Sequence, residues 1–244
     1  MALYLTVGAA IAIICVVFNK ISNKIGVPML FAFILLGMLF GSDGLFKIRF
    51  ENFEFAEKIC SVSLIFIIFY GGFGTKWSSA KKVAAKSLLL SSAGTLLTAF
   101  LTGLFCYYVL RFSMAESMLV GAVLSSTDAA SVFNILRSKS LNLKYGTASV
   151  LELESGSNDP WAYMLTIIVL SVMSGGVSGW KTSYMLFAQI FYGLGIGVLI
   201  ALGAVWALKN IEFESDGFDT IFIAAAAVLS YALPALVGGN GYLS

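Results

Sequence analysis

The sequence contains no histidine, and only three cysteines and three prolines, in 244 residues. The absence of histidine excludes the commonest zinc ligand and the side chain that titrates near neutral pH, so any proton transfer falls to carboxylates. Cys15, Cys60 and Cys106 are far apart and each lies in an apolar run. This spacing excludes a disulfide framework or a thiolate metal motif, and we expect three packed thiols.

Charged residues are also scarce, at 11% of the chain against 59% hydrophobic residues. Soluble domains carry about a quarter charged residues and disordered chains are more polar still, so both classes are excluded. The net charge is only +2, and the charges form short clusters instead of a basic face, which excludes nucleic acid as a partner. The partner that this composition favours is the lipid bilayer.

Long apolar runs indicate membrane-spanning helices, each of which needs about 20 mostly apolar residues. We predict an all-α polytopic membrane protein with about eight transmembrane helices, which lie near residues 3–18, 27–40, 59–73, 87–110, 117–136, 146–170, 183–208 and 219–238. The second and third runs are short for a full crossing. Polar residues interrupt the fifth and sixth runs, and discontinuous helices are expected there.

The distribution of Lys and Arg predicts the orientation in the membrane. The loops on the same side as Lys20 and Lys24 hold ten of the fifteen Lys and Arg residues, and the opposite loops hold five. Because basic loops are retained in the cytoplasm, we expect a multi-pass protein of the cell inner (cytoplasmic) membrane with its amino terminus outside.

The hydrophilic segments are too short for a separate domain, so residues 1–244 are predicted to form one transmembrane domain with no soluble domain. The apolar run starts at Leu3 with no basic residue before it, and no removed signal peptide is expected. Residues 238–244 are predicted to open a further helix. The 24 glycines, including Gly193, Gly195 and Gly197, predict close helix packing.

Four acidic residues lie inside apolar runs: Asp128, Glu152, Glu154 and Asp159. A carboxylate at the centre of a bilayer costs on the order of 3 kcal/mol on insertion scales. Such residues are rare in spans, and they mark ion pathways or proton relays more often than structural pairs. The four acids are therefore candidate functional residues.

Residues 151–160 place three of these acids on one helix. Ser155 and Asp159 are four positions apart, as are Glu154 and Asn158, so each pair shares a helix face and Glu154 is within hydrogen-bonding reach of Asn158. Glu152 is expected about one turn deeper than the pair formed by Ser155 and Asp159. Pro160 has no N–H for the Gly156 carbonyl, which is predicted to be free beside the carboxylate. Oxygen ligands gathered in this way suit an alkali cation.

The segment Ser125-Ser126-Thr127-Asp128 interrupts the fifth run. Hydroxyl side chains and an aspartate favour local side-chain to backbone hydrogen bonds, so we predict unwound backbone here. Such backbone is tolerated at membrane depth only where protein or a watery cavity surrounds it. Asp128 would then lie at the amino end of a half-helix, which stabilises an anion. The alternative is an ordinary helix whose Ser and Thr side chains bond back one turn.

At these residues the sequence resembles the NhaP-type monovalent cation/proton antiporters, in particular their potassium/proton or cell-volume-regulation branch. Three segments carry the resemblance: Tyr70–Trp77, Ser125–Phe133 and Leu151–Pro160. It extends over nearly the whole chain, from the first helix to Gly241–Ser244.

The resemblance implies an inverted-repeat antiporter fold with a dimerisation domain and a moving core domain, and a homodimer where the fold is complete. It implies that Asp159 binds a monovalent cation and a proton in turn, with Ser155 and Thr127 as further cation ligands and with Asn158, Glu154 and Asp128 beside them. An Asn-Asp pair at Asn158 and Asp159 implies electroneutral exchange. The chain would be the amino-terminal part of such a protein, with an incomplete second repeat.

The function expected from this resemblance is secondary active exchange of K⁺ or Na⁺ for H⁺, without a cofactor. Two alternatives remain open: a cation channel lined by the same acids, and a truncated product that inserts without transporting. An enzyme is not expected, because the sequence shows no pairing of nucleophile and base and no metal cluster.

Overall fold

The computed structural model describes residues 6, 8–17, 29–75, 77–138, 143–175, 179–211 and 217–244, and all regular elements in these ranges are helical. The contacts group the chain into two units, Met1–Ile59 and Cys60–Ser244. Leu3, Lys20 and Lys24, and with them the ends of the first predicted span, lie outside the described residues.

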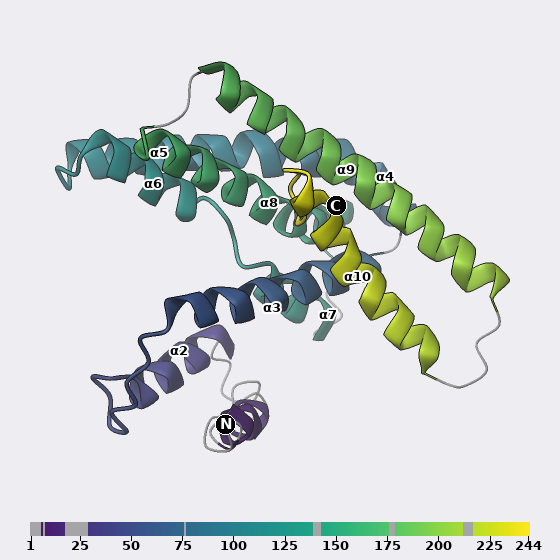
Figure 1. Ribbon diagram of the computed structural model, residues 1–244, viewed down its shortest axis with the longest axis horizontal. Helices are drawn as coiled ribbons and strands as arrows, with labels where there is room; N and C mark the ends of the chain where they lie inside the picture. Colours follow the sequence, from purple (N-terminus) through teal and green to yellow (C-terminus); the bar gives the residue numbers. More distant parts are fainter. Residues whose placement is uncertain are drawn as a thin grey trace. The chain divides into compact units, whose positions relative to one another are not determined.

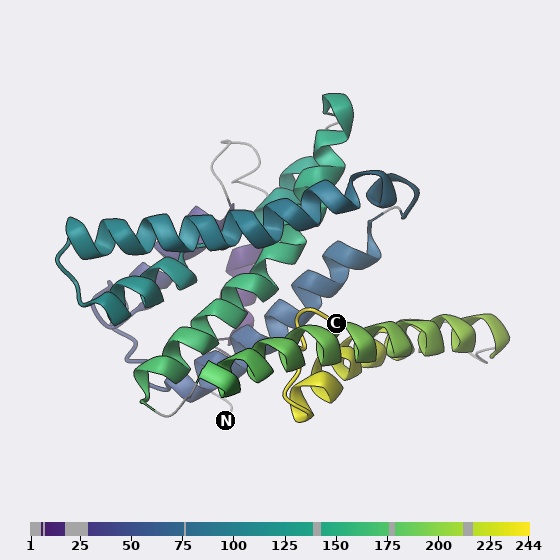
Figure 2. The same ribbon diagram turned by 90° about the horizontal axis from the view of Figure 1, so that it is seen from above.

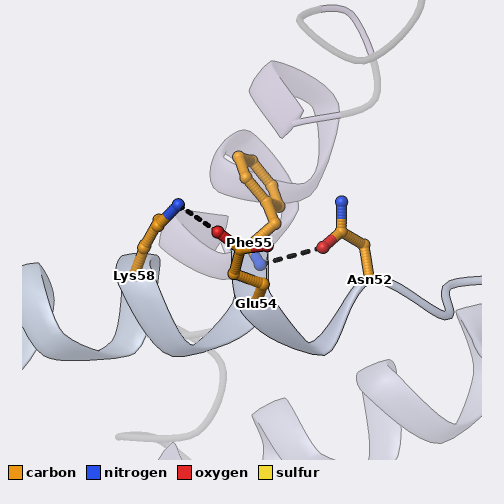
Figure 3. A network of polar contacts seen from close by, with 4 residues as sticks. All are labelled: Asn52, Glu54, Phe55 and Lys58. Carbon is orange, nitrogen blue, oxygen red and sulfur yellow. Dashed lines mark hydrogen bonds and ion pairs between the residues drawn. The ribbon is translucent and has the colours of Figure 1, made fainter.

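The first unit contains a helix over Gly8–Val17, α2 (Met29–Phe40) and the start of α3 (Phe53–Phe73). Asn52 caps α3 by accepting a hydrogen bond from the Phe55 N–H at 3.0 Å, and Lys58 and Glu54 form an ion pair at 2.6 Å one turn along (Figure 3). The cap satisfies an otherwise unpaired helix N–H. It starts α3 six residues before the run at 59–73, so a full-length third helix replaces the short one predicted.

The second unit contains α4 (Trp77–Leu89), a π-helical turn η1 (Leu90–Gly94) and α5 (Thr95–Tyr108), which form one continuous helix of 32 residues. The predicted span began only at residue 87. The helix extends farther because residues 80–86 are mostly alanine and lysine, which are strong helix formers that a hydropathy pattern does not detect. Figure 2 shows this helix crossing α8 (Thr147–Met173), and Ser87 donates to the Val150 carbonyl at their contact.

The remaining elements of the second unit are α6 (Met114–Val123), α7 (Ala129–Ser138), the short 3₁₀ turn η2 (Lys144–Gly146), α9 (Gly179–Asn210) and α10 (Phe218–Leu236). The helix pairs α5–α6, α6–α8, α7–α8 and α9–α10 are in contact. Of the described helices, the α4–α5 helix, α9 and α10 are each long and apolar enough to cross a membrane.

Glycines permit the closest helix contacts, as predicted. A Cβ at Gly121 of α6 would meet the Ala99 carbonyl of α5, and one at Gly156 would lie 3.2 Å from the Phe133 ring. A Cβ added at Gly193 would lie 2.7 Å from the Asn240 carbonyl oxygen, whereas one added at Gly195 would meet open space. Only alternate glycines of α9 therefore serve packing.

Two expectations outside the site are wrong. Residues 238–244 form turns instead of opening a helix, because Asn240 bonds through its backbone N–H to the Gln189 carbonyl and folds the segment back onto α9. Cys106 is buried but Cys60 is exposed, because it lies on an outward face of α3. The expectation of packed thiols is thus confirmed for Cys106 and wrong for Cys60.

Candidate functional site

The helix that would span residues 117–136 is broken in its middle. α6 ends at Val123 and α7 begins at Ala129, and Figure 1 shows the non-helical segment between them. The Ser125 hydroxyl donates to the Ala122 carbonyl at 2.7 Å and so closes the end of α6. The predicted break is confirmed. The alternative of an uninterrupted helix is wrong, because the four polar residues satisfy their groups locally and across to α8.

Asp128 lies directly before α7, at the amino end of this half-helix. Its carboxylate accepts the backbone N–H of Ser131 at 3.3 Å and a bond from the Ser131 hydroxyl. These two bonds and the positive end of the helix dipole stabilise the anion. The expected position of Asp128 is confirmed. Both of these bonds lie within its own half-helix, and Asp128 shares with Asp159 the cavity described below.

Asp159 of α8 meets the broken segment through Ser126. The Ser126 hydroxyl donates to the Asp159 carboxylate, lies 3.1 Å from the Asn158 amide oxygen and 3.3 Å from the Thr127 carbonyl oxygen. A hydroxyl has one proton, so these three acceptors compete for it. Ser126 is therefore one of the side chains that join the broken segment to α8.

Asn158 connects the same two segments deeper in the protein. It is 1% exposed, and its amide nitrogen donates to the Thr127 hydroxyl at 2.6 Å and to the Glu154 carboxylate at 3.1 Å. Thr127 in turn lies 3.2 Å from the Ser155 hydroxyl. The expected bond between Glu154 and Asn158 is confirmed. Both amide protons of Asn158 are used, which fixes the orientation of the amide.

A cavity of about 330 Å³ opens beside these residues. It lies between α3, the broken segment and α8, and is lined by Leu64, Ile67, Val123, Ser126, Thr127, Asp128, Ala129, Ala130, Asp159, Ala162, Tyr163 and Thr166. Asp128 and Asp159 are its two carboxylates. Glu154, Ser155 and Asn158 do not line it, and they support the lining residues from behind.

Sequence reasoning missed some features of the site and misjudged another. Ser126 belongs to the segment expected to unwind, but the sequence did not predict it as a site residue. Tyr163 and Thr166 also line the cavity, and they follow Asp159 by four and seven positions, so helix-face spacing identifies them as neighbours of Asp159. Glu152 does not line the cavity. α8 also continues through Pro160 without a break, so the predicted interruption of the sixth run is wrong. Only the N–H to the Gly156 carbonyl is lost there, and the packing of α8 on α4, α6 and α7 holds the helix together.

The side-chain types determine which ion this arrangement suits. The Asp159 carboxylate, the hydroxyls of Ser126 and Thr127 and the Thr127 carbonyl are hard oxygen donors, which suit alkali cations better than transition metals. Among the described residues no three His, Cys, Asp or Glu side chains come together as metal ligands. One carboxylate within reach of neutral oxygens is also a place where a proton can reside.

Comparison with known proteins identifies the family. Residues 9–244 match the family described as sodium/hydrogen exchanger, transmembrane. The chain is 32% identical over 99% of its length to the K⁺/H⁺ antiporter NhaP2 of Shewanella sp. strain ANA-3, and 34% identical over 95% of its length to the K⁺/H⁺ antiporter NhaP of Alkalimonas amylolytica. It spans 42% and 40% of the length of these two curated relatives.

A solved structure shows the same fold. The sodium proton antiporter MjNhaP1 of Methanocaldococcus jannaschii superposes with a TM-score of 0.79 at 24% identity, over all of this chain and 60% of that one. The all-helical multi-pass membrane fold predicted from the sequence is thereby confirmed. Because the match covers residues 9–244 of this chain, the chain belongs to the transmembrane sodium/hydrogen exchanger family of transporters.

Proposed function

We propose that this chain carries the ion-binding half of a secondary antiporter that exchanges K⁺ or Na⁺ for H⁺, with Asp159 as the shared binding group. One observation supports this most directly: the broken segment at Ser126–Thr127 is bonded to Asp159 and Asn158 of α8 at the wall of a cavity. Ser155 and Thr127 supply further oxygens, and Asp128 and Glu154 complete the site.

Competition for one carboxylate couples the two fluxes. An alkali ion held by Asp159 and the nearby hydroxyls places a positive charge where the proton would sit, and a protonated Asp159 is a neutral group that no longer attracts the ion. The two ligands therefore exclude each other. Exchange follows when the helices that carry Asp128 and Asp159 move against the others and present the cavity to each side in turn.

We propose one-for-one, electroneutral exchange, because Asn158 replaces a second ionisable group beside Asp159. We favour K⁺ over Na⁺ because the two relatives described above are named K⁺/H⁺ antiporters. A relative from Methanocaldococcus jannaschii that is 26% identical is named a probable Na⁺/H⁺ antiporter. Exchange that does not change with an imposed membrane potential supports the stoichiometry, and parallel assays in KCl and NaCl decide the cation.

The family resemblance and the distribution of Lys and Arg also lead to a proposal for the assembly and its orientation in the membrane. We propose a single transmembrane domain that forms a homodimer in the cytoplasmic membrane, with the amino terminus outside and the Lys-rich segments, including Lys81 and Lys82 near the start of α4, at the cytoplasmic side. Cysteine labelling with a membrane-impermeant reagent tests the orientation, because the reagent reaches the outer face in intact cells and the cytoplasmic face in everted vesicles.

The experiment is dequenching of a pH-sensitive dye in everted vesicles after K⁺ or Na⁺ addition, with protein produced from its complete reading frame. Asp159→Asn and Asp159→Ala are expected to abolish the cation-dependent signal. The matched control is Asp43→Asn, an exposed aspartate in the loop after α2. Unchanged exchange in both Asp159 variants contradicts the proposal.

The same assay separates the competing functions. A channel gives cation flux that does not depend on a proton gradient and far exceeds carrier rates. A non-transporting product inserts stably but gives no cation-dependent proton movement. Among the described residues, the cavity is lined by two carboxylates, four hydroxyl side chains and apolar residues, without a repeated ring of carbonyls, an arrangement that favours the carrier.

A further inference from the structure

The turn after α10 contacts the helix that carries Asp159. Asn240, which is 1% exposed, donates from its side-chain amide to the Pro160 carbonyl of α8 at 3.0 Å. Its backbone N–H donates to the Gln189 carbonyl of α9, also at 3.0 Å. The amide oxygen accepts the Tyr242 N–H at 3.0 Å. A single buried residue thus ties α8 to α9 at the position next to Asp159.

A second contact lies beside the first. The ring of Tyr242, which is 7% exposed, packs edge-on against Tyr163 of α8 with centroids 5.1 Å apart. It also packs at a tilt against Tyr231 of α10, with centroids 4.7 Å apart. Tyr163 lines the cavity together with Asp159. The turn therefore reaches the wall of the proposed ion site from the side of α9 and α10.

Few other contacts join these two groups of helices. α8 packs mainly on α4 and α6, and also on α7, whereas α9 packs mainly on α10 and touches α8 only slightly. Gly193 makes room for the turn, since a Cβ there would lie 2.7 Å from the Asn240 carbonyl oxygen. Within the described residues, the bonds of Asn240 and the ring of Tyr242 consequently provide a buried polar and aromatic link between α8 and the α9–α10 pair.

We propose that Asn240 and Tyr242 form a latch that holds α8 in one of the two states of the transport cycle. The proposal rests on the proposed function, which requires the Asp159 helix to move against other helices. A hydrogen bond of 3.0 Å is lost once its atoms separate beyond about 3.5 Å. Helix shifts in such transitions are on the order of 1–2 Å or more. The bond to Pro160 therefore exists in one state and is absent in the other.

Asn240 is a positioning residue in this scheme, because it does not line the cavity and acts through α8. Losing a neutral hydrogen bond of ordinary strength changes the ratio of two states about fivefold. In Asn240→Ala the apparent cation affinity is expected to weaken on the side open in the latched state and to strengthen on the other side, by up to about fivefold each.

A merely structural role predicts a different result. It lowers the maximum rate equally from both sides and leaves the two apparent affinities unchanged, and that outcome overturns the latch. The matched control is Asn210→Ala, which removes one exposed hydrogen bond to the Trp206 carbonyl at the end of α9.

Cross-linking tests the movement itself. Tyr163→Cys and Tyr242→Cys are combined in full-length protein whose Cys15, Cys60 and Cys106 are replaced by serine, and are joined by a short, reversible bifunctional thiol reagent. Exchange is expected to fall well below that of either labelled single variant and to return on reduction. Cross-linked protein that exchanges as fast as the labelled single variants overturns the latch. Full-length protein with its native cysteines that shows no cation-dependent exchange refutes the proposed function instead.

Discussion

Replacing Asn158 with alanine removes two donated hydrogen bonds at the centre of the site. These are the bonds to Thr127 at 2.6 Å and to Glu154 at 3.1 Å; the amide oxygen, 3.1 Å from the Ser126 hydroxyl, only competes with Asp159 for its one proton. Each buried bond contributes about 1 kcal/mol net, so the loss of two is expected to cost about 2 kcal/mol. Because the bonds fix the Thr127 oxygen beside Asp159, part of this cost appears as weaker cation binding, with an upper limit of about thirtyfold.

The assays for Asn158→Ala are thermal melting in detergent and the concentration of K⁺ or Na⁺ that gives half-maximal exchange in vesicles. The control, Asn210→Ala, has the same change of side chain but loses one exposed bond of 2.7 Å. We expect a lower melting temperature and a raised half-maximal concentration for Asn158→Ala only. Equal values for the two variants would refute the reasoning, because the two donated bonds would then contribute nothing measurable.

Two further predictions compare neighbouring glycines. Gly71→Ala places a methyl group against the buried Phe133 ring, whereas Gly72→Ala places one in open space. Only Gly71→Ala is therefore expected to lower the melting temperature, by an overpacking cost of about 1–3 kcal/mol. Equal melting temperatures for the two variants would show that the ring does not pack there. Gly193→Ala intrudes on the turn after α10 while Gly195→Ala does not, and a loss of exchange confined to the first is expected in vesicles, with equal activity as the contrary result.

Much of the fold could be predicted from hydropathy, because the bilayer requires long apolar helices and imposes a strong pattern. Helix starts were less predictable. The helices that begin at Phe53 and Trp77 start with charged and hydroxyl residues among the apolar ones, and they are favoured by a cap and by the helix propensity of alanine and lysine, which hydropathy does not measure. Hydropathy therefore detects where a helix is in lipid and not where it begins.

The site shows the same limits. Spacing along one helix correctly paired Glu154 with Asn158, because that contact depends on local geometry alone. The bond of Ser126 to Asp159 and the bond of Asn240 to Pro160 join residues 33 and 80 positions apart. No local rule predicts such pairs, since they arise only when separate helices pack.

The most direct measurement is of proton release when the purified full-length protein binds its cation in weakly buffered solution. If one Asp159 carboxylate holds either ligand, addition of K⁺ or Na⁺ to the protonated protein releases close to one proton for each cation bound, and Asp159→Asn abolishes this release while Asp43→Asn does not. Cation binding without proton release, or release that is unchanged in Asp159→Asn, would contradict a shared binding group.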